Sequence, residues 1–249
     1  MRVALITGST RNIGHAIAGR LAADGVTVVL NGRDPARTEQ AAARLREQGR
    51  EAHGHACDVT DRDQVRAMVE QVTERIGPVE ILVNNAVVRH HAAITDTHVD
   101  DWRHVLRVVL DGAFHSSQAV LPGMVDGGWG RIVNIAGLSG QTGAVGRIAV
   151  VTAKSGVMGL TRSIAMEFAH AGITCNSVSP GIIDTQREHP PGQEAVAGRF
   201  YAEKAAQVPV GRMGRPEEIA AVCSYLCSDA AGFTTGQTFG VNGGAYLWS

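Results

Sequence analysis

Residues 3–25, VALITGSTRNIGHAIAGRLAADG, decide the fold of this 249-residue chain. The stretch begins with a continuous apolar run, which is typical of a short strand buried on both faces. A turn that contains Gly8 and Gly14 follows, and apolar residues recur at helical spacing from Ile13 onward. Glycine lets a backbone approach a ligand closely, and the first N–H groups of a helix point toward the preceding turn. The stretch therefore predicts a phosphate-binding site between a strand and a helix.

The next apolar run, residues 26–30, follows the first helix and completes a β-α-β unit. It ends in Asn31, Gly32 and Arg33, without the acidic residue that accepts the 2′-hydroxyl of an NAD ribose. Arg33 and Arg11 instead offer positive charge where a 2′-phosphate would lie. The sequence therefore predicts NADP(H) as the cofactor.

The composition excludes several classes of protein. The formal net charge is −1, so no basic field favours nucleic acid or a membrane surface as a partner. We expect no signal peptide, because the first residues begin a strand, and no apolar run approaches the roughly 20 residues of a membrane span. The four cysteines lack the spacing of a zinc site, so we expect no metal, reduced thiols and a cytoplasmic location.

Strand-like and helix-like patterns alternate along the chain with short connections. This order predicts an α/β protein with a doubly wound, Rossmann-type parallel sheet of about seven strands and helices on both faces. We expect a single domain over residues 1–249, with its ligand beyond the carboxyl ends of the strands. The expected strands are 3–6, 26–30, 51–57, 79–83, 131–135, 174–178 and 238–241. Residues 184–208 contain prolines and few apolar residues, which is typical of a mobile lid.

Several motifs occur in the order of one known family. They are TGSTRNIG at 7–14, Asp58-Val59, Asn84-Asn85-Ala86, Lys154, NSVSPG at 176–181 with Thr185, and TGQTFGVNGG at 235–244. On these motifs the chain resembles the short-chain dehydrogenase/reductase family over nearly its whole length. The resemblance implies redox chemistry with a nicotinamide dinucleotide and a small-molecule substrate. It also implies a homo-oligomer, a dimer or a tetramer, with two long helices forming a dimer face.

The resemblance further implies which residues contact the dinucleotide. Those along the pyrophosphate are Gly8, Arg11, Asn12, Ile13 and Gly14. Those near the adenine are Asp58 and Val59, and those beside the adenosine ribose are Asn85 and Ala86. Those facing the nicotinamide are Pro180, Gly181 and Thr185. Lys154 would hold the hydroxyl groups of the nicotinamide ribose.

The catalytic positions depart from the family's pattern. The family passes a hydride to a carbonyl carbon while a tyrosine, assisted by a lysine, gives a proton to the oxygen that a serine holds. Four residues before Lys154 stands Val150 in place of the tyrosine. Gly137 and Val109 stand where the serine and an asparagine are expected. Valine and glycine side chains have no proton to give, so we expect an atypical active site without the usual acid.

Two residues depart from the family's pattern in the cofactor site. Asn12 replaces a glycine in the turn, and asparagine tolerates a left-handed backbone better than most residues. Val87 replaces the glycine after Asn84-Asn85-Ala86, and its branched side chain either narrows the pocket or only repacks it.

Other side chains are candidates for supplying the missing proton. His90 and His91 follow the fourth expected strand, where the family lines its substrate pocket, and histidine titrates near neutrality. Tyr201 lies in the expected lid and carries a phenol. Ser139 lies two residues past the missing serine and takes its role if the loop shifts in register.

Three functions remain open from the sequence. The first is an atypical NADP(H)-dependent oxidoreductase that reduces a conjugated C=C bond or a carbonyl group in a small organic substrate. The C=C bond suits the site best, because hydride addition to a conjugated system can precede protonation. The second is non-redox chemistry on the same scaffold, as a lyase, cyclase, dehydratase or isomerase. The third is a subunit without catalysis that supports an active homologous partner.

Overall fold

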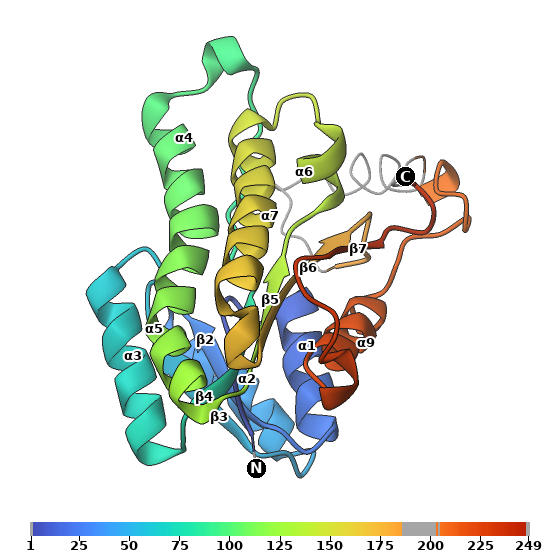
Figure 1. Cartoon of the computed structure of the whole chain (residues 1–249). Coiled ribbons are helices and arrows are strands. Elements are labelled where there is room, and N and C mark those ends of the chain that lie inside the picture. Colours follow the sequence, from blue (N-terminus) through green and yellow to red (C-terminus); the bar gives the residue numbers. More distant parts are fainter. Residues whose placement is uncertain (1, 186–202, 204, 248–249) are drawn as a thin grey trace.

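The computed structural model describes residues 2–185, 203 and 205–247. Within these residues, seven parallel strands form one sheet in the order β3-β2-β1-β4-β5-β6-β7 (Figure 1). The strands are β1 (Val3–Ile6), β2 (Thr27–Gly32), β3 (Ala52–Ala56), β4 (Val79–Asn84), β5 (Gly130–Ile135), β6 (Ile173–Pro180) and β7 (Thr238–Val241). The predicted doubly wound sheet is confirmed, because successive strands are added first on one side of β1 and then, from β4, on the other.

The strands are apolar because both faces of the sheet are covered. In β1, Ala4 and Ile6 pack on one face while Val3 and Leu5 pack on the other, as the alternation of side chains along a strand requires. All four side chains are buried. A continuous apolar run is therefore the expected sequence of such a strand.

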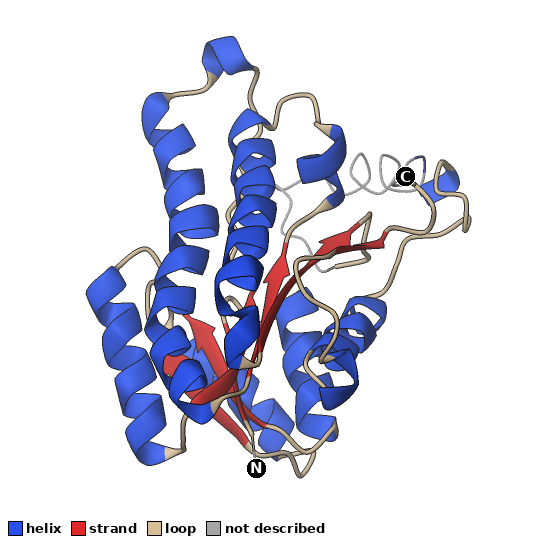
Figure 2. Ribbon diagram, in the orientation of Figure 1, coloured by secondary structure: helices blue, strands red, loops and turns tan. Residues whose placement is uncertain are grey.

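Helices cover both faces of the sheet, as Figure 2 shows. The helices that pack on the face of Ala4 and Ile6 are α1 (Asn12–Ala23), α2 (Pro35–Arg46) and α9 (Pro216–Leu226). Those on the opposite face are α3 (Arg62–Arg75), α5 (Gly112–Gly127) and α7 (Ile148–Phe168). Two shorter helices contact α7, namely α4 (Val99–Leu106) and α6 (Leu138–Thr142). No helix in the described ranges is long and apolar enough to cross a membrane.

The structure differs from the sequence prediction at one irregular turn. The helical pattern of about residues 100–125 predicts one long helix, whereas the structure has α4 and α5 joined by a π-helical turn at Arg107–Asp111. Such turns are frequent at functional sites. Short 3-10 turns occur at Ile94–Asp96, Ala169–Ala171 and Asp229–Ala231. Most of the expected lid, residues 186–202 and 204, lies outside the described residues.

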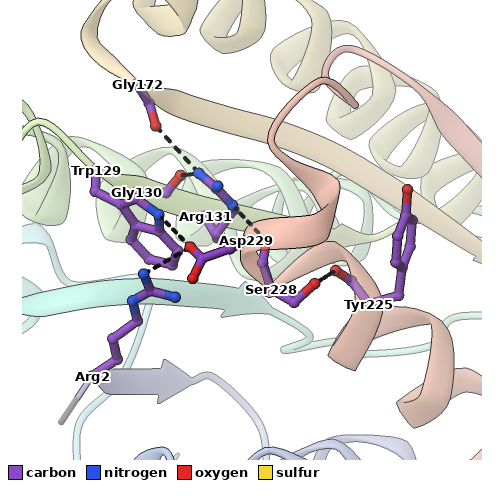
Figure 3. Close-up of polar contacts among 8 residues, drawn as sticks. All are labelled: Arg2, Trp129, Gly130, Arg131, Gly172, Tyr225, Ser228 and Asp229. Carbon is purple, nitrogen blue, oxygen red and sulfur yellow. Dashed lines mark hydrogen bonds and ion pairs between the residues drawn. The ribbon is translucent and has the colours of Figure 1, made fainter.

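Arg131 ties the amino end of β5 to two other segments (Figure 3). Only 4% of its surface is exposed. Its guanidinium donates hydrogen bonds to the carbonyl oxygens of Gly130 at 2.9 Å, Gly172 at 3.2 Å and Ser228 at 3.2 Å. A buried charged group needs such partners, because burial without them is costly.

Trp129 lies between two arginines in the same cluster. The guanidinium carbons of Arg2 and Arg131 lie 3.6 Å and 4.2 Å from the centre of its ring, a cation–π geometry. Asp229 accepts hydrogen bonds from the indole N–H of Trp129 at 3.1 Å and from Arg2 at 2.8 Å. The hydrogen bond from Arg2 lowers the pKa of Asp229. The cluster therefore joins the starts of β1 and β5 to the turn after α9.

Replacing Arg131 with methionine should lower the free energy of unfolding by about 1–3 kcal/mol, because buried carbonyl groups lose their donor. Chemical denaturation measures the loss. The matched control is Arg66→Met, since Arg66 pairs with Glu70 at the surface with 74% of its side chain exposed. We expect the control to change stability by less than about 0.5 kcal/mol. Equal effects of the two changes would contradict the role given to Arg131.

Candidate active site

Two glycines shape the turn that follows β1. Gly8 has a φ of +60°, and a Cβ atom there would lie 2.8 Å from the Cα atom of Ala86. A Cβ atom on Gly14 would lie 2.5 Å from Nδ2 of Asn85 and 2.7 Å from the carbonyl oxygen of Gly8. All three distances are shorter than real Cβ contacts, so the turn and the start of α1 require glycine at these positions.

Asn85, directly after β4, holds this turn in place. Its Nδ2 atom donates to the carbonyl oxygens of Gly8 at 2.8 Å and Thr7 at 3.2 Å. The hydroxyl oxygen of Thr7 accepts from the backbone N–H groups of Asn85 and Ala86 in return. The turn therefore lies where β1 and β4 diverge, which is where open α/β sheets bind ligands. The Asn85 amide is hydrogen-bonded to the turn, and its predicted contact with an adenosine ribose stays a prediction.

The two departures in the cofactor site have different surroundings. Asn12 is the one non-glycine residue with a positive φ in the described chain, at +53°. A left-handed backbone costs an ordinary residue about 1–2 kcal/mol, and asparagine is among the residues that adopt it most readily. This explains why Asn12 can replace a glycine. Val87 is 46% exposed, so its side chain does not fill the interior at the end of β4.

The positive charges expected beside a 2′-phosphate lie at the surface. Arg11 in the turn and Arg33 after β2 are both exposed. Arg44 reaches from α2 to the same turn and donates to the carbonyl oxygen of Thr10 at 3.3 Å. Sequence analysis did not single out Arg44, because its distance along the chain hides its approach to the turn.

The remaining residues predicted to contact the cofactor lie in the loop after β3 and at or beyond the end of β6; they are Asp58, Val59, Pro180, Gly181 and Thr185. Asp58 accepts a hydrogen bond from the N–H group of Thr60 at 2.9 Å. Val59 is buried, with 5% of its surface exposed. Gly181 donates its N–H group to the carbonyl oxygen of Val241 at 3.0 Å. These contacts fix the two loops at the carboxyl edge of the sheet.

Lys154 lies in α7 and reaches the end of β5. Its amine donates a hydrogen bond to the carbonyl oxygen of Ile135, and only 6% of the residue is exposed. Helix α6 packs against it so closely that a Cβ atom on Gly140 would lie 2.9 Å from the Cβ atom of Lys154. Burial lowers the pKa of Lys154 to about 8, and the positive charge of Arg89 acts in the same direction.

Apolar groups occupy the neighbourhood of Lys154. Val109 and Val150, with 3% and 7% of their surfaces exposed, belong to one apolar cluster formed by α4, the π-helical turn, α5 and α7. Gly137 has an extended backbone, and a Cβ atom there would meet nothing within 4 Å. These three positions, where the resemblance implies asparagine, tyrosine and serine, therefore present no side-chain proton to the lysine.

The candidate proton donors lie in different places. His90 is partly buried, with Nδ1 4.0 Å from the carboxylate of Asp101, whereas His91 is exposed. Ser139 lies within α6 and does not line the cavity beside the α7 lysine. Tyr201 lies outside the described residues. The role of each as a proton donor stays a prediction.

Sequence analysis missed two residues beside Lys154. Arg89 directly precedes the histidine pair that attracted attention, yet its charge lowers the pKa of the lysine. Asn84 lines a small cavity together with Lys154, although only its neighbour Asn85 was predicted to belong to the site. The motif gives the position of Asn84 in the chain, whereas the direction of its side chain depends on the packing of α5 and β5.

The site fits a nicotinamide dinucleotide. The turn offers a backbone cradle that a Cβ atom on Gly8 or Gly14 would disturb, and beside it lie the first N–H groups of α1, exposed arginines and a buried amine near the end of β5. No group of three or more histidine, cysteine or acidic residues in the described ranges could hold a metal ion. All four cysteines are buried free thiols. Fold and site together define a dinucleotide-binding scaffold of the oxidoreductase class.

Comparison with known proteins narrows this class. Residues 8–246 match the family model described as Enoyl-(Acyl carrier protein) reductase. The chain is 39% identical over 249 residues to the 3-oxoacyl-(acyl-carrier-protein) reductase FabG of Pseudomonas aeruginosa, covering 99% of this chain and 98% of the relative. It is 36% identical over 247 residues to an acetoacetyl-CoA reductase of Cupriavidus necator, with the same coverage. The chain belongs to the short-chain dehydrogenase/reductase family.

A solved structure agrees with this assignment. The gluconate 5-dehydrogenase of Burkholderia cenocepacia, in complex with NADP and tartrate, superposes with a TM-score of 0.90 at 33% identity. The superposition covers 98% of this chain and 94% of that one. The family resemblance read from the motifs is confirmed, and the NADP of that complex agrees with the predicted cofactor.

The buried amine of Lys154 predicts a pH-dependent stability. Its pKa is about 8 in the folded chain and 10.5 ordinarily, so the unfolded chain binds more protons between these values. The free energy of unfolding should therefore rise by about 3 kcal/mol as the pH increases through this window. The Lys154→Met variant lacks this titration and is the reference. Chemical denaturation of both proteins measures the difference, and a difference that stays constant with pH would contradict the lowered pKa.

Proposed function

We propose that this chain is a cytoplasmic, NADP(H)-linked reductase of a small organic substrate that works without the tyrosine and serine of its family. One observation carries the proposal: the glycine cradle and the buried Lys154 are present, while Val109, Val150 and Gly137, at the positions where the resemblance implies asparagine, tyrosine and serine, carry side chains without a proton to donate. The reductases of 3-oxoacyl and acetoacetyl thioesters among the relatives support a thioester as the substrate.

Different residues of the site would contact different parts of the cofactor. Gly8 and Gly14 would let the pyrophosphate lie against the first N–H groups of α1, and Arg11 and Arg33 would face a 2′-phosphate. Lys154 would hold the hydroxyl groups of the nicotinamide ribose. When bound, NADPH supplies the hydride for reduction. The complex of gluconate 5-dehydrogenase with NADP supports NADP(H) as the cofactor.

The apolar surroundings of Lys154 determine which bond the site suits. Hydride addition to a simple carbonyl group places negative charge on one oxygen, which needs a proton donor close by. Val150 and Gly137 offer none. Hydride addition to a C=C bond conjugated with a carbonyl spreads the charge over an enolate, and a proton can reach the carbon later from water. We therefore favour a conjugated enoyl thioester or enone over a simple ketone.

The final proton and the assembly complete the proposal. His90, His91, Ser139 and Tyr201 are the candidate donors to the enolate or carbonyl oxygen, and water is the alternative.

We propose a homodimer or homotetramer formed through the long helices α5 and α7, as the family resemblance implies. A hetero-oligomer with an active family member is the alternative if the chain binds no nucleotide. The three relatives compared above are two reductases and a dehydrogenase, and they give no support to a lyase, cyclase, dehydratase or isomerase.

Thermal unfolding with NADPH tests the cofactor. At 100 times its Kd, NADPH should raise the free energy of unfolding by about 2.7 kcal/mol, seen as a higher melting temperature. Gly14→Ala should remove this rise, because the new Cβ atom would lie 2.5 Å from Nδ2 of Asn85. Gly123→Ala is the matched control, since a Cβ atom there meets nothing within 4 Å. A wild-type chain that responds to neither NADPH nor NADP+ would refute the proposed cofactor.

Restoring the missing hydroxyl groups tests the chemistry. A serine side chain finds open space at residue 137, and a tyrosine at residue 150 would lie one helical turn before the lysine. The double variant Gly137→Ser with Val150→Tyr should reduce acetoacetyl-CoA about 10²–10⁴ times faster than the wild type. The pair Gly137→Ala with Val150→Phe adds similar bulk without hydroxyl groups and should gain nothing. A wild-type chain as fast as the Ser/Tyr variant would show that another donor is already in place.

A further inference from the structure

Helix α6, which carries Gln141, lies beside α7 (Figure 1). The hydroxyl of Ser155, in α7, donates to the carbonyl oxygen of Gly140 at 2.7 Å. A Cβ atom on Gly140 would also lie 2.9 Å from the Cβ atom of Lys154. This hydrogen bond and this close contact fix α6 against α7, one residue before Gln141.

A buried serine of β6 contacts the side chain of Gln141. Ser179 has 0% of its surface exposed, and it directly precedes Pro180 and Gly181. Its hydroxyl donates to Oε1 of Gln141 at 2.6 Å. The Gln141 amide therefore lies at the carboxyl end of β6, next to the two residues that the family resemblance places at the nicotinamide.

The buried hydroxyl determines how the Gln141 amide is turned. In the described part of the chain, the hydroxyl of Ser179 has no second acceptor. Rotating the amide by half a turn would set this hydroxyl against an NH2 group and leave its buried proton without an acceptor, which folded proteins rarely allow. Ser179 thus keeps the oxygen of Gln141 toward β6, and the NH2 group points away from the serine.

The NH2 group of Gln141 keeps its hydrogen bonds for a ligand. It carries two donors, and neither meets an acceptor among residues 2–185, 203 and 205–247. Gln141 is only partly buried, so a ligand can reach the group. Gly137, four residues earlier, leaves open space at the start of the same helix, because a Cβ atom there would meet nothing within 4 Å.

We propose that the NH2 group of Gln141 binds the carbonyl oxygen of an α,β-unsaturated acyl thioester and stabilises the negative charge that this oxygen gains during reduction. Gln141 contacts the substrate, and Ser179 is a positioning residue that acts through it. The reduction itself rests on the proposed function, whereas binding of a thioester enolate at Gln141 does not need the cofactor.

An amide N–H group suits the reduction of a C=C bond. A hydride supplied by NADPH joins the β carbon of the thioester, and the electron pair of the C=C bond becomes an enolate shared between the α carbon and the carbonyl oxygen. A proton from water then joins the α carbon and restores the carbonyl group. The oxygen needs a hydrogen-bond donor while it is charged, but it keeps no proton. A primary amide supplies such a donor without releasing its own proton near neutral pH.

Acetoacetyl-CoA tests the binding step without turnover. Loss of a proton from its α carbon gives an enolate that absorbs near-ultraviolet light, so a pH titration gives the pKa of the bound thioester. In the nucleotide-free wild type this pKa should lie below that of free acetoacetyl-CoA. Gln141→Met has a similar size but no donor, and it should raise the pKa of the bound ligand by about 1–2 pH units, the effect of one lost hydrogen bond to a charged group.

Thr142→Val is the matched control for this titration. Thr142 is the next residue of α6, it is exposed, and its hydroxyl contacts the carbonyl oxygens of Leu138 and Gly143 in its own turn. Its replacement should leave the pKa of bound acetoacetyl-CoA at the wild-type value.

Reduction of crotonyl-CoA by NADPH gives a second readout. Gln141→Glu keeps an acceptor for Ser179 and replaces only the NH2 group with an oxygen, so kcat should fall about 10²–10³-fold while KM changes little. Ser179→Ala frees the amide to rotate and should lower kcat about fivefold, the value of one neutral hydrogen bond. This second loss should vanish in the Gln141→Met background, whereas a purely structural role of Ser179 would give the same loss in both backgrounds.

Three results would overturn the proposal. They are a wild-type chain that does not bind acetoacetyl-CoA, a pKa of the bound ligand that is the same in Gln141→Met, and a Gln141→Glu variant that reduces crotonyl-CoA as fast as the wild type. Failure to bind NADPH would instead refute the proposed function, and the titration of the nucleotide-free chain would still decide the role of Gln141.

Discussion

The close approach of Asn85 to the glycine turn is the constraint on which the site depends. The Asn85 amide donates to two carbonyl oxygens of the turn, and its Nδ2 atom lies only 2.5 Å from the position that a Cβ atom of Gly14 would take. The end of β4 and the start of α1 can therefore meet only because the chain has no side chain there. This contact places the first N–H groups of α1 at the point where β1 and β4 diverge, which makes the cradle a product of the backbone.

The part of the site around Lys154 is built from side chains, and its properties depend on their packing and burial. Around Lys154 the helices pack through small apolar groups, among them Val109 and Val150, and burial lowers the pKa of the lysine to about 8. An amine in such surroundings loses its proton at a pH closer to neutral than a surface lysine does. The same methyl groups that pack the π-helical turn against α7 thus also contribute to the burial that lowers the pKa of Lys154.

This division explains how a family member can depart from its relatives without losing the fold. A cradle made of backbone tolerates substitution wherever φ and space allow, as Asn12 shows at +53°. Proton delivery requires particular side-chain atoms, so replacing a hydroxyl group with a methyl group changes the chemistry while leaving an apolar core well packed. The chain therefore remains similar to 3-oxoacyl and acetoacetyl-CoA reductases over 99% of its length, while the reaction that we propose depends on a few positions near one lysine.

The sequence by itself determined the alternation of strands and helices, the glycine turn and the apolar or absent side chains of Val109, Val150 and Gly137, because each depends on local periodicity or on the identity of a single residue. Residue 150 is a valine in any conformation of the chain, so it cannot supply a phenol. Only the tertiary structure decided the π-helical turn at 107–111, the bracing role of Asn85, the approach of Arg44 and the contact of Ser179 with Gln141. These features arise where segments far apart in the chain meet, and burial, which lowers the pKa of Lys154, exists only after β4, β5 and α7 have packed together.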